Sequence, residues 1–232
     1  MFLTVENGVK VYGSDQAEVR ALDGVNFSLE KGKICVILGP SGSGKSTLMN
    51  MIGGVDSLDS GKLTVDGREI SAMNKKELTR YRKDQIGFVF QFYNLIDDLS
   101  AQENIQVVAD LCDKPLDIPA LMESLGIGEL KDRFPKELSG GQQQRVAIAR
   151  AMVKNPKVLL CDELTGALDS HASRVVLQAV EQLNREFGTT VIMITHNVEI
   201  AAMADRVISI KDGQISKSEE NPHKVSAAQI AL

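Results

Sequence analysis

The sequence predicts an α/β protein with parallel strands at its centre and helices on both faces of the sheet. Short runs rich in β-branched residues alternate with longer segments of helical periodicity, which is typical of this class. Two departures refine the prediction. The first part reads as strands joined by turns, and one long segment contains only helices. We therefore expect an α/β core with an antiparallel β subdomain and an inserted α-helical subdomain.

The expected elements follow from periodicity and from the Gly, Pro, Asn and Asp residues that bound each run. Apolar, β-branched runs predict strands over residues 3–11, 25–29, 34–38, 62–65, 86–90, 158–161, 190–195 and 207–210. Helical spacing predicts helices over residues 45–53, 75–83, 101–111, 119–125, 141–153, 172–187 and 198–203. Asp23-Gly24 and Asp66-Gly67 are read as turns of the antiparallel layer.

The chain of 232 residues suits one domain with an inserted part. No strand is expected between residues 97 and 153, where prolines and glycines separate helices. We assign 1–91 and 154–216 to the β subdomain and α/β core, and 92–153 to the helical subdomain. Residues 217–232 are expected to be a polar tail with a weakly apolar end, either a short helix or disordered.

Bulk composition excludes some classes of function. The net charge is -5, from 26 Lys and Arg against 31 Asp and Glu, whereas nucleic-acid binders usually carry a basic excess. No apolar run is long enough to span a bilayer, and the N-terminus lacks the pattern of a signal peptide. A role at a membrane would therefore need other chains to supply the spans.

The strongest motif is a glycine-rich loop between the strand 34–38 and the helix 45–53. Glycines let successive backbone N–H groups point at phosphate oxygens, and the helix that follows adds the positive end of its dipole. Lys45 can reach the β- and γ-phosphates, and the Ser46 hydroxyl can bind Mg²⁺. A chance Gly/Ser-rich turn is disfavoured by the flanking strand and helix. The predicted nucleotide-binding residues are Gly39, Pro40, Ser41, Gly42, Ser43, Gly44, Lys45, Ser46 and Thr47.

A second motif is the acidic pair at the end of the apolar run 158–161. Parallel strands present their carboxyl ends at the edge of the sheet where ligands bind. Asp162 would hold Mg²⁺ there, usually through its water shell, and Glu163 would act as a general base near the attacking water. Taken alone, the pair could equally be a solvent-facing strand end. The phosphate loop disfavours that alternative.

A third motif, Leu138-Ser139-Gly140-Gly141-Gln142, opens the helix 141–153. Exposed N–H groups at a helix start capped by Ser139 form a second anion site. A chain with one phosphate loop needs no second cradle unless that cradle serves the nucleotide of another copy. Together with the phosphate loop and the acidic strand end, LSGGQ resembles the ABC ATPase family, whose core is a P-loop NTPase (RecA-like) fold.

The resemblance covers about residues 1–215 and implies further roles. Family members pair head to tail, with each ATP between the phosphate loop of one subunit and the signature helix of the other. Gln91 matches the glutamine that senses Mg²⁺ and water, and His196 matches the switch histidine at the γ-phosphate. Asp169 lies in the match to the D-loop, and Tyr12 lies where an aromatic ring stacks on adenine. The implied cofactors are ATP and Mg²⁺.

One position departs from the family pattern. The family usually has a proline after the catalytic glutamate, whereas this chain has Leu164. Leucine frees φ and restores a backbone N–H. We expect altered stiffness of the loop that leads to Asp169, without loss of catalysis.

The implied partners are a second copy of the chain and a transmembrane permease subunit, which would hold the protein at the cytoplasmic face of the membrane. The segment 91–96, with its aromatic residues, lies where the resemblance places the docking groove for the permease. The sequence resembles the macrolide-exporter, lipoprotein-release, cell-division and peptide-resistance group. A soluble ABC ATPase of an assembly or regulatory complex remains the alternative. A chromosome-type head is excluded, since no long coiled coil separates the motifs.

Overall fold

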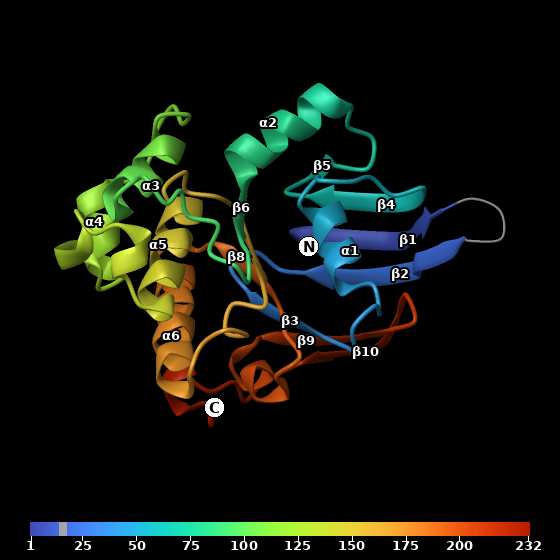
Figure 1. Ribbon diagram of the computed structural model, residues 1–232. Coiled ribbons are helices and arrows are strands. Elements are labelled where there is room, and N and C mark those ends of the chain that lie inside the picture. The colour runs from blue at the N-terminus through green and yellow to red at the C-terminus, as the bar shows by residue number, and fades with distance from the viewer. Residues whose placement is uncertain (14–17) are drawn as a thin grey trace.

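The computed structural model describes residues 1–13 and 18–232. Figure 1 shows three parts: a central sheet, a smaller antiparallel sheet on one side and a group of helices on the other. This is the predicted α/β architecture. Every described residue between the strands β6 and β7 is helical or irregular, as the sequence predicts for the inserted helices.

The central sheet has the strand order β10-β9-β3-β8-β7-β6. All neighbours pair in parallel except β10, which pairs antiparallel with β9. Parallel pairing puts the carboxyl ends of β3, β6, β7 and β8 at one edge, where the chemical motifs of the sequence follow. The strands are β3 Ile34–Leu38, β6 Ile86–Val89, β7 Val158–Asp162, β8 Thr190–Ile194, β9 Arg206–Lys211 and β10 Gln214–Glu220.

The second sheet is antiparallel, with the order β2-β1-β4-β5. Asp66 and Gly67 both have positive φ and form the predicted turn between β4 and β5. The turn predicted at Asp23-Gly24 is wrong. Gly24 has φ +68 but lies inside β2, where the register with β1 shifts, because a left-handed glycine serves a β-bulge as well as a turn. The strands are β1 Leu3–Tyr12, β2 Val19–Leu29, β4 Ser60–Val65 and β5 Arg68–Glu69.

The helices begin at side-chain caps in most cases. Asn74, Ser100 and Ser139 each form a capping box at the start of α2, α3 and α5, and Asp169 caps α6. The predicted helix at the segment Val198–Met203 is a 3-10 helix, η4. The α-helices are α1 Lys45–Ile52, α2 Lys75–Gln85, α3 Ala101–Ala109, α4 Ile118–Ser124, α5 Gly140–Met152 and α6 Ser170–Phe187.

The central strands are buried on both faces, which explains their unbroken apolar runs. Along β3, Ile34 and Val36 pack into a core with the inserted helices and α6. Cys35 and Ile37 face the opposite core, which α1 fills together with the antiparallel sheet. The alternation has the period of two that a strand requires. The two cores hold α1 on one side of the sheet and α5 and α6 on the other.

The C-terminal segment has the short helix offered as one alternative, the 3-10 helix η5 Ala227–Gln229, but the rest differs from the polar tail predicted for residues 217–232. The strand β10 runs to Glu220, and beyond it Ala227 and Ile230 are buried against the core that contains α6. The strand β10 was not predicted because it is an edge strand with most of its side chains exposed. Its sequence therefore lacks the apolar alternation that indicates a strand.

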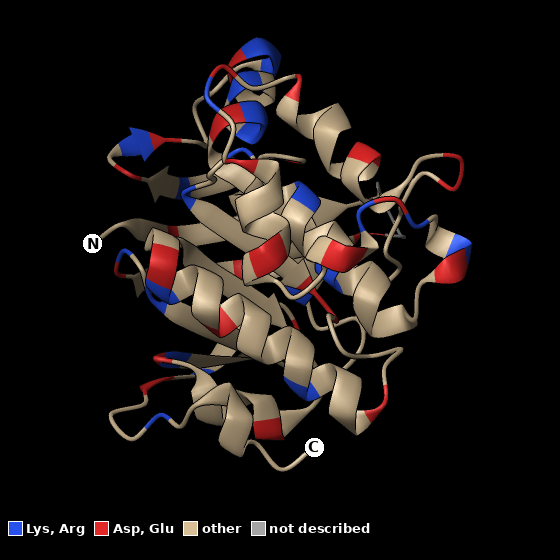
Figure 2. Ribbon diagram, turned by 90° about the vertical axis from the view of Figure 1, so that its left-hand side faces the viewer, with Lys and Arg blue, Asp and Glu red and all other residues tan. Residues whose placement is uncertain are grey.

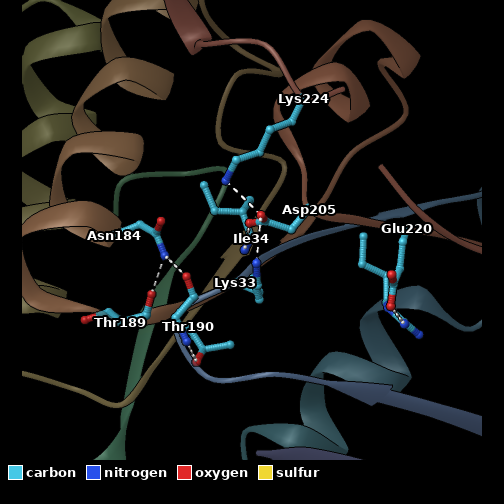
Figure 3. Close-up of polar contacts among 10 residues, drawn as sticks. Lys33, Ile34, Asn184, Thr189, Thr190, Asp205, Glu220 and Lys224 are labelled. Atoms are coloured by element: carbon cyan, nitrogen blue, oxygen red, sulfur yellow. Dashed lines mark hydrogen bonds and ion pairs between the residues drawn. The ribbon is translucent and has the colours of Figure 1, made fainter. Parts of the chain in front are cut away.

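A carboxylate fastens this segment to the start of β3, as Figure 3 shows. Asp205 accepts a hydrogen bond of 2.9 Å from the amide of Ile34 and lies 2.8 Å from the Lys224 Nζ. Burial raises the pKa of Asp205, but the amide hydrogen bond and Lys224 outweigh it, so the pKa lies below its ordinary value of 3.8. The ionised carboxylate therefore stabilises the folded chain.

Charged residues lie mainly on the outer helices and hairpins, whereas the central strands carry few (Figure 2). The basic residues of α2 include Lys75, Lys76, Arg80, Arg82 and Lys83, with Glu77 and Asp84 among them. Among the described residues, no helix is both long and apolar enough to cross a bilayer.

Replacing Asp205 by Ala should lower the free energy of unfolding by about 2 kcal/mol, because a charged acceptor is lost from a buried amide. Since the folded pKa lies below the unfolded one, this contribution is complete at neutral pH and disappears as the pH falls through the folded-state pKa, below about pH 4. Urea denaturation at pH 7 and pH 3 measures both effects.

Asp66→Ala is the matched control for Asp205→Ala. Asp66 pairs with Lys157, but both side chains are well exposed, so its loss should cost less than about 1 kcal/mol. Equal losses of stability for the two variants at pH 7 would contradict the role given to Asp205.

Candidate functional site

The phosphate loop connects β3 to α1 and is shaped by two glycines. Gly39 has φ +155 and Gly44, the N-cap of α1, has φ +105. A Cβ on Gly39 would stand 2.2 Å from the Ile210 carbonyl oxygen, and one on Gly44 would stand 2.3 Å from that of Ala21. The loop therefore passes between a strand of each sheet, and only glycine fits at both positions.

The start of α1 is left open toward this loop. No side chain caps the helix, and no acidic residue lies in its first turn, so its first N–H groups are available to an anion. Lys45 is almost fully buried, and its Nζ donates to the carbonyl oxygens of Gly39 and Pro40 at 2.8 and 2.7 Å. The Ser43 hydroxyl is buried without a hydrogen-bond partner among the described residues.

The acidic pair follows β7, as predicted. Burial raises the pKa of Asp162, the neighbouring Glu163 carboxylate raises it further, and Lys45 opposes the shift. Glu163 Oε2 lies 3.0 Å from the Nδ1 of His196, which follows β8 and is largely exposed. The contact lacks hydrogen-bond geometry, so that buried carboxylate oxygen has no hydrogen-bond partner in the described structure. It is available to a group that enters the site.

Glu163 has φ +50, an uncommon left-handed conformation for a residue with a side chain. A proline at the next position would push Glu163 toward extended backbone. Leu164, which is buried in the core beside α6, permits the left-handed turn. The departure from the family pattern is thus coupled to the local backbone of Glu163. The expected change in loop stiffness stays a prediction.

One open cleft of about 550 Å³ gathers the predicted residues that follow the central strands. Val19 and Ala21 of β2 also line it, and they could not be predicted from the sequence, because apolar residues in a strand carry no chemical signal. From the predicted set, the cleft is lined by Gly39, Pro40, Ser41, Gly42, Ser43, Gly44, Lys45, Ser46, Thr47, Gln91, Asp162, Glu163 and His196.

The signature segment does not line this cleft. Ser139 caps α5, accepting from the Gln142 amide at 3.4 Å, while the Gln142 side chain accepts from the Ser139 amide at 2.8 Å. A Cβ on Gly140 would stand 2.6 Å from the Tyr93 hydroxyl, and one on Gly141 would stand 3.0 Å from the Ala172 Cβ. The glycines thus let α5 approach its neighbours, and Ser139 at the start of the helix is exposed.

Two more predicted residues lie outside the cleft lining. Asp169 caps α6 through the Ala172 amide at 2.8 Å, so it has a local structural role. Tyr12 ends β1 directly opposite Val19, and residues opposite each other in a ladder share a face. Since Val19 lines the cleft, the Tyr12 ring lies at its border, and 41% of the residue is exposed.

The residues fit a nucleoside triphosphate with a hydrated divalent cation. Open amides and Lys45 suit phosphate oxygens, and the orphaned oxygen of Glu163 faces the same cleft. The pKa of Asp162 is raised because burial and the Glu163 carboxylate disfavour its charged form. A nearby cation would favour that charged form. No cluster of three or more His, Cys, Asp or Glu suited to a metal exists in residues 1–13 and 18–232.

The fold and cleft define a P-loop nucleotide-binding protein: an anion cradle between a central strand and its helix, with acidic residues on a neighbouring strand. A family model described as ABC transporter matches residues 22–166, more than half of the chain, so the chain belongs to this family. It carries the family's ATP-binding, ATPase-type domain.

Curated relatives agree with this assignment. The chain is 43% identical over 234 residues to the macrolide export ATP-binding/permease protein MacB of Hyphomonas neptunium, covering 99% of this chain and 36% of MacB. It is 40% identical over 218 residues to the bacitracin export ATP-binding protein BceA of Halalkalibacterium halodurans, covering 92% and 86%. A putative ABC transporter ATP-binding protein of Mycoplasma genitalium, MG467, is 44% identical, and the chain spans 66% of its length.

Solved structures match over nearly the whole chain. A dimeric post-hydrolysis state of the ATP-binding cassette MJ0796, bound to ADP and Pi, superposes with a TM-score of 0.83 at 38% identity, covering 94% of this chain and 98% of that one. A second dimeric structure of MJ0796, described as a bacterial ABC transporter cassette, gives 0.84 at 36% identity. The predicted family and fold are confirmed.

Replacing Gly44 by Ala should weaken ATP binding by more than about tenfold, because the new Cβ would meet the Ala21 carbonyl and the left-handed backbone costs ~1–2 kcal/mol. Isothermal titration with ATP measures this. Gly67→Ala is the control, since Gly67 has φ +74 with no atom within 4 Å of the new Cβ. It should lose a similar amount of stability and bind ATP normally. Normal ATP affinity in Gly44→Ala would contradict the cradle.

Proposed function

We propose that the chain is the ATP-hydrolysing subunit of a membrane ABC transporter or a related mechanotransmission complex. ATP binding would close a head-to-tail dimer of two copies, and hydrolysis would reopen it. The observation that carries the proposal is the separation of the two glycine-rich motifs: the phosphate loop lines the cleft, whereas the capped start of α5 lies outside it. Each nucleotide site is therefore complete only with a second copy.

Within this mechanism the residues of the cleft bind and orient. The amides of residues 39–47 and the Lys45 ammonium would hold the phosphates, and Ser46, Gln91 and Asp162 would hold Mg²⁺, which supplies charge neutralisation on the phosphates. Glu163 would take the proton of the attacking water through its free oxygen, and His196 beside it would contact the γ-phosphate. The partner copy would contribute Ser139, Gly140, Gly141 and Gln142 from its α5 and Asp169 from its D-loop.

The cleft is tied to the inserted helices through the segment after β6. Gln91 lines the cleft, and the next residues are held by α5: Arg150 donates to the carbonyls of Tyr93 and Asn94 at 2.9 and 2.6 Å. Gln144, on the same helix, donates to the Phe90 carbonyl at 3.4 Å. A movement of Gln91 on nucleotide binding would therefore be passed to α5 and to the helical subdomain.

An exposed apolar surface beside this segment supports a membrane partner. Phe92 is 72% exposed, and Phe90 and Ile96 are also exposed, which is unusual for large apolar residues so close together. We propose that a cytoplasmic segment of a permease covers them, which would place the chain at the inner face of the membrane. The relatives MacB and BceA are a macrolide export and a bacitracin export protein, which favours an exporter of the macrolide and peptide-resistance group.

The alternative function is a soluble ABC ATPase in an assembly or regulatory complex. It would use the same cleft, so the catalytic residues do not separate the two proposals. The exposed Phe92 surface and the export proteins among the relatives favour the transporter. Recovery of the chain only in soluble complexes would favour the alternative.

Glu163→Gln should abolish turnover while ATP binding persists, because the amide keeps the shape of the side chain but cannot accept a proton at neutral pH. General-base catalysis typically contributes about 10²–10⁴-fold to a rate. With ATP, the variant should accumulate as a dimer in analytical ultracentrifugation. A variant that stayed monomeric with saturating ATP and hydrolysed it normally would overturn the role of Glu163.

The pairing of the two sites is tested by adding Ser139→Arg to the Glu163→Gln variant. The double variant should bind ATP through its intact phosphate loop but remain monomeric, because the arginine blocks the start of α5. Dimers of the double variant would show that the signature segment does not lie in the interface.

Phe92→Asp should abolish co-purification of the chain with its membrane partner from detergent extracts, because a charge would enter the apolar contact. In the Glu163→Gln background it should still form the ATP-dependent dimer. Val198→Asp is the matched control, since Val198 is also an exposed apolar residue, but on η4. Retention of the membrane partner by Phe92→Asp would place the docking surface elsewhere.

A further inference from the structure

A partly buried charged cluster lies at the end of β1, beside the nucleotide cleft. Lys10 is 9% exposed, and its Nζ lies 3.2 Å from Asp56 Oδ1, 3.4 Å from Asp59 Oδ1 and 2.9 Å from the Ser57 carbonyl oxygen. A lysine so deeply buried is held only by such partners. The cluster belongs to no part of the phosphate, metal or dimer machinery described above.

The cluster holds the side chain of Tyr12. The Tyr12 hydroxyl donates to Asp56 Oδ2 at 2.9 Å, and the Lys10 Nζ lies over the ring, 5.2 Å from its centroid. A cation over one face is favourable to the ring and leaves the opposite face for another group. The side chain is thus fixed at its tip and on one face, although 41% of the residue is exposed.

The backbone near Tyr12 is hydrogen-bonded to the loop between α1 and β4, which contains Asp56 and Asp59. The ladder between β1 and β4 ends at Val9 and Ser60. Beyond that pair, Asp59 provides the hydrogen bonds to β1: its amide donates to the Val9 carbonyl at 2.9 Å, and its carboxylate accepts from the Val11 amide at 2.6 Å. The end of β1 is therefore attached to the loop after α1.

That loop in turn continues from the helix of the phosphate cradle. The Val55 and Asp56 amides donate to the Asn50 carbonyl in the last part of α1, at 2.9 and 3.4 Å. One short helix thus carries the phosphate-binding amides at its start and the anchor of Tyr12 just beyond its end.

We propose that Asp56, held by Lys10, is a positioning residue that fixes the Tyr12 ring as the platform for the nucleotide base. The inference rests on the proposed function, since it concerns the nucleotide of the same cleft. Because α1 joins the two contacts, the separation between the phosphate cradle and the base platform is set before the nucleotide enters. Without Asp56 the ring would sample other rotamers, and ordering it would reduce the affinity for the base.

The test compares ADP with inorganic pyrophosphate, which has phosphates but no base, by isothermal titration with the full chain. Asp56→Ala and Tyr12→Phe should each raise the Kd of ADP about three- to tenfold. This loss of affinity is smaller than that expected when the stacking of a whole base is removed. The double variant should be no weaker than either single one, because both changes break the same hydrogen bond. The Kd of pyrophosphate should change by less than about twofold.

Asp113→Ala is the control, because it removes an exposed carboxylate from the inserted helices and should bind ADP normally. Tyr12→Phe carries the test if Asp56→Ala does not fold, since it removes one oxygen atom at an exposed side chain. Wild-type ADP affinity in Tyr12→Phe, additive losses, or parallel weakening of pyrophosphate would each overturn the role of Asp56. Failure of the wild-type chain to bind ADP or ATP would overturn the proposed function as well.

Discussion

The nucleotide cleft depends on one steric constraint: the loop from Gly39 to Gly44 passes between two backbone carbonyls, Ile210 in the central sheet and Ala21 in the antiparallel sheet. No side chain fits at either glycine. The strands of the two sheets on either side of the loop therefore set its position. This fixes the start of α1, whose first amides are free of side-chain caps and therefore suit an anion. The other groups of the site reach the same cleft because their strands are parallel to β3.

The helix α1 sets the distance between the phosphate loop at its start and the loop with Asp56 that follows it. Its apolar residues, Leu48, Met51 and Ile52 among them, fill the core between the two sheets, so the helix is held along its length. Its first turn lines the cleft, and the loop beyond its last turn contains Asp56. The distance between the phosphate cradle and the proposed base platform is therefore a property of the packed core.

Some features were readable from the sequence and some were not. The carboxyl ends of β3, β6, β7 and β8 meet at one edge, so apolar runs ending in polar residues were enough to bring Lys45, Gln91, Asp162 and His196 together. The bulge at Gly24 and the docked C-terminal segment were missed. A left-handed glycine marks a turn and a bulge alike, and an edge strand such as β10 needs no apolar alternation.

The family, the phosphate loop and the layered α/β architecture follow from the order of residues alone, because each depends on local spacing: glycines at fixed offsets and apolar runs of strand length. The folded chain was needed to show that Lys10, Asp56 and Tyr12 form one cluster, and that Asp205 connects the last residues to β3. These groups are 46, 44 and 171 residues from their partners along the chain. Charges so far apart in sequence leave no periodic trace, and only packing brings them into contact.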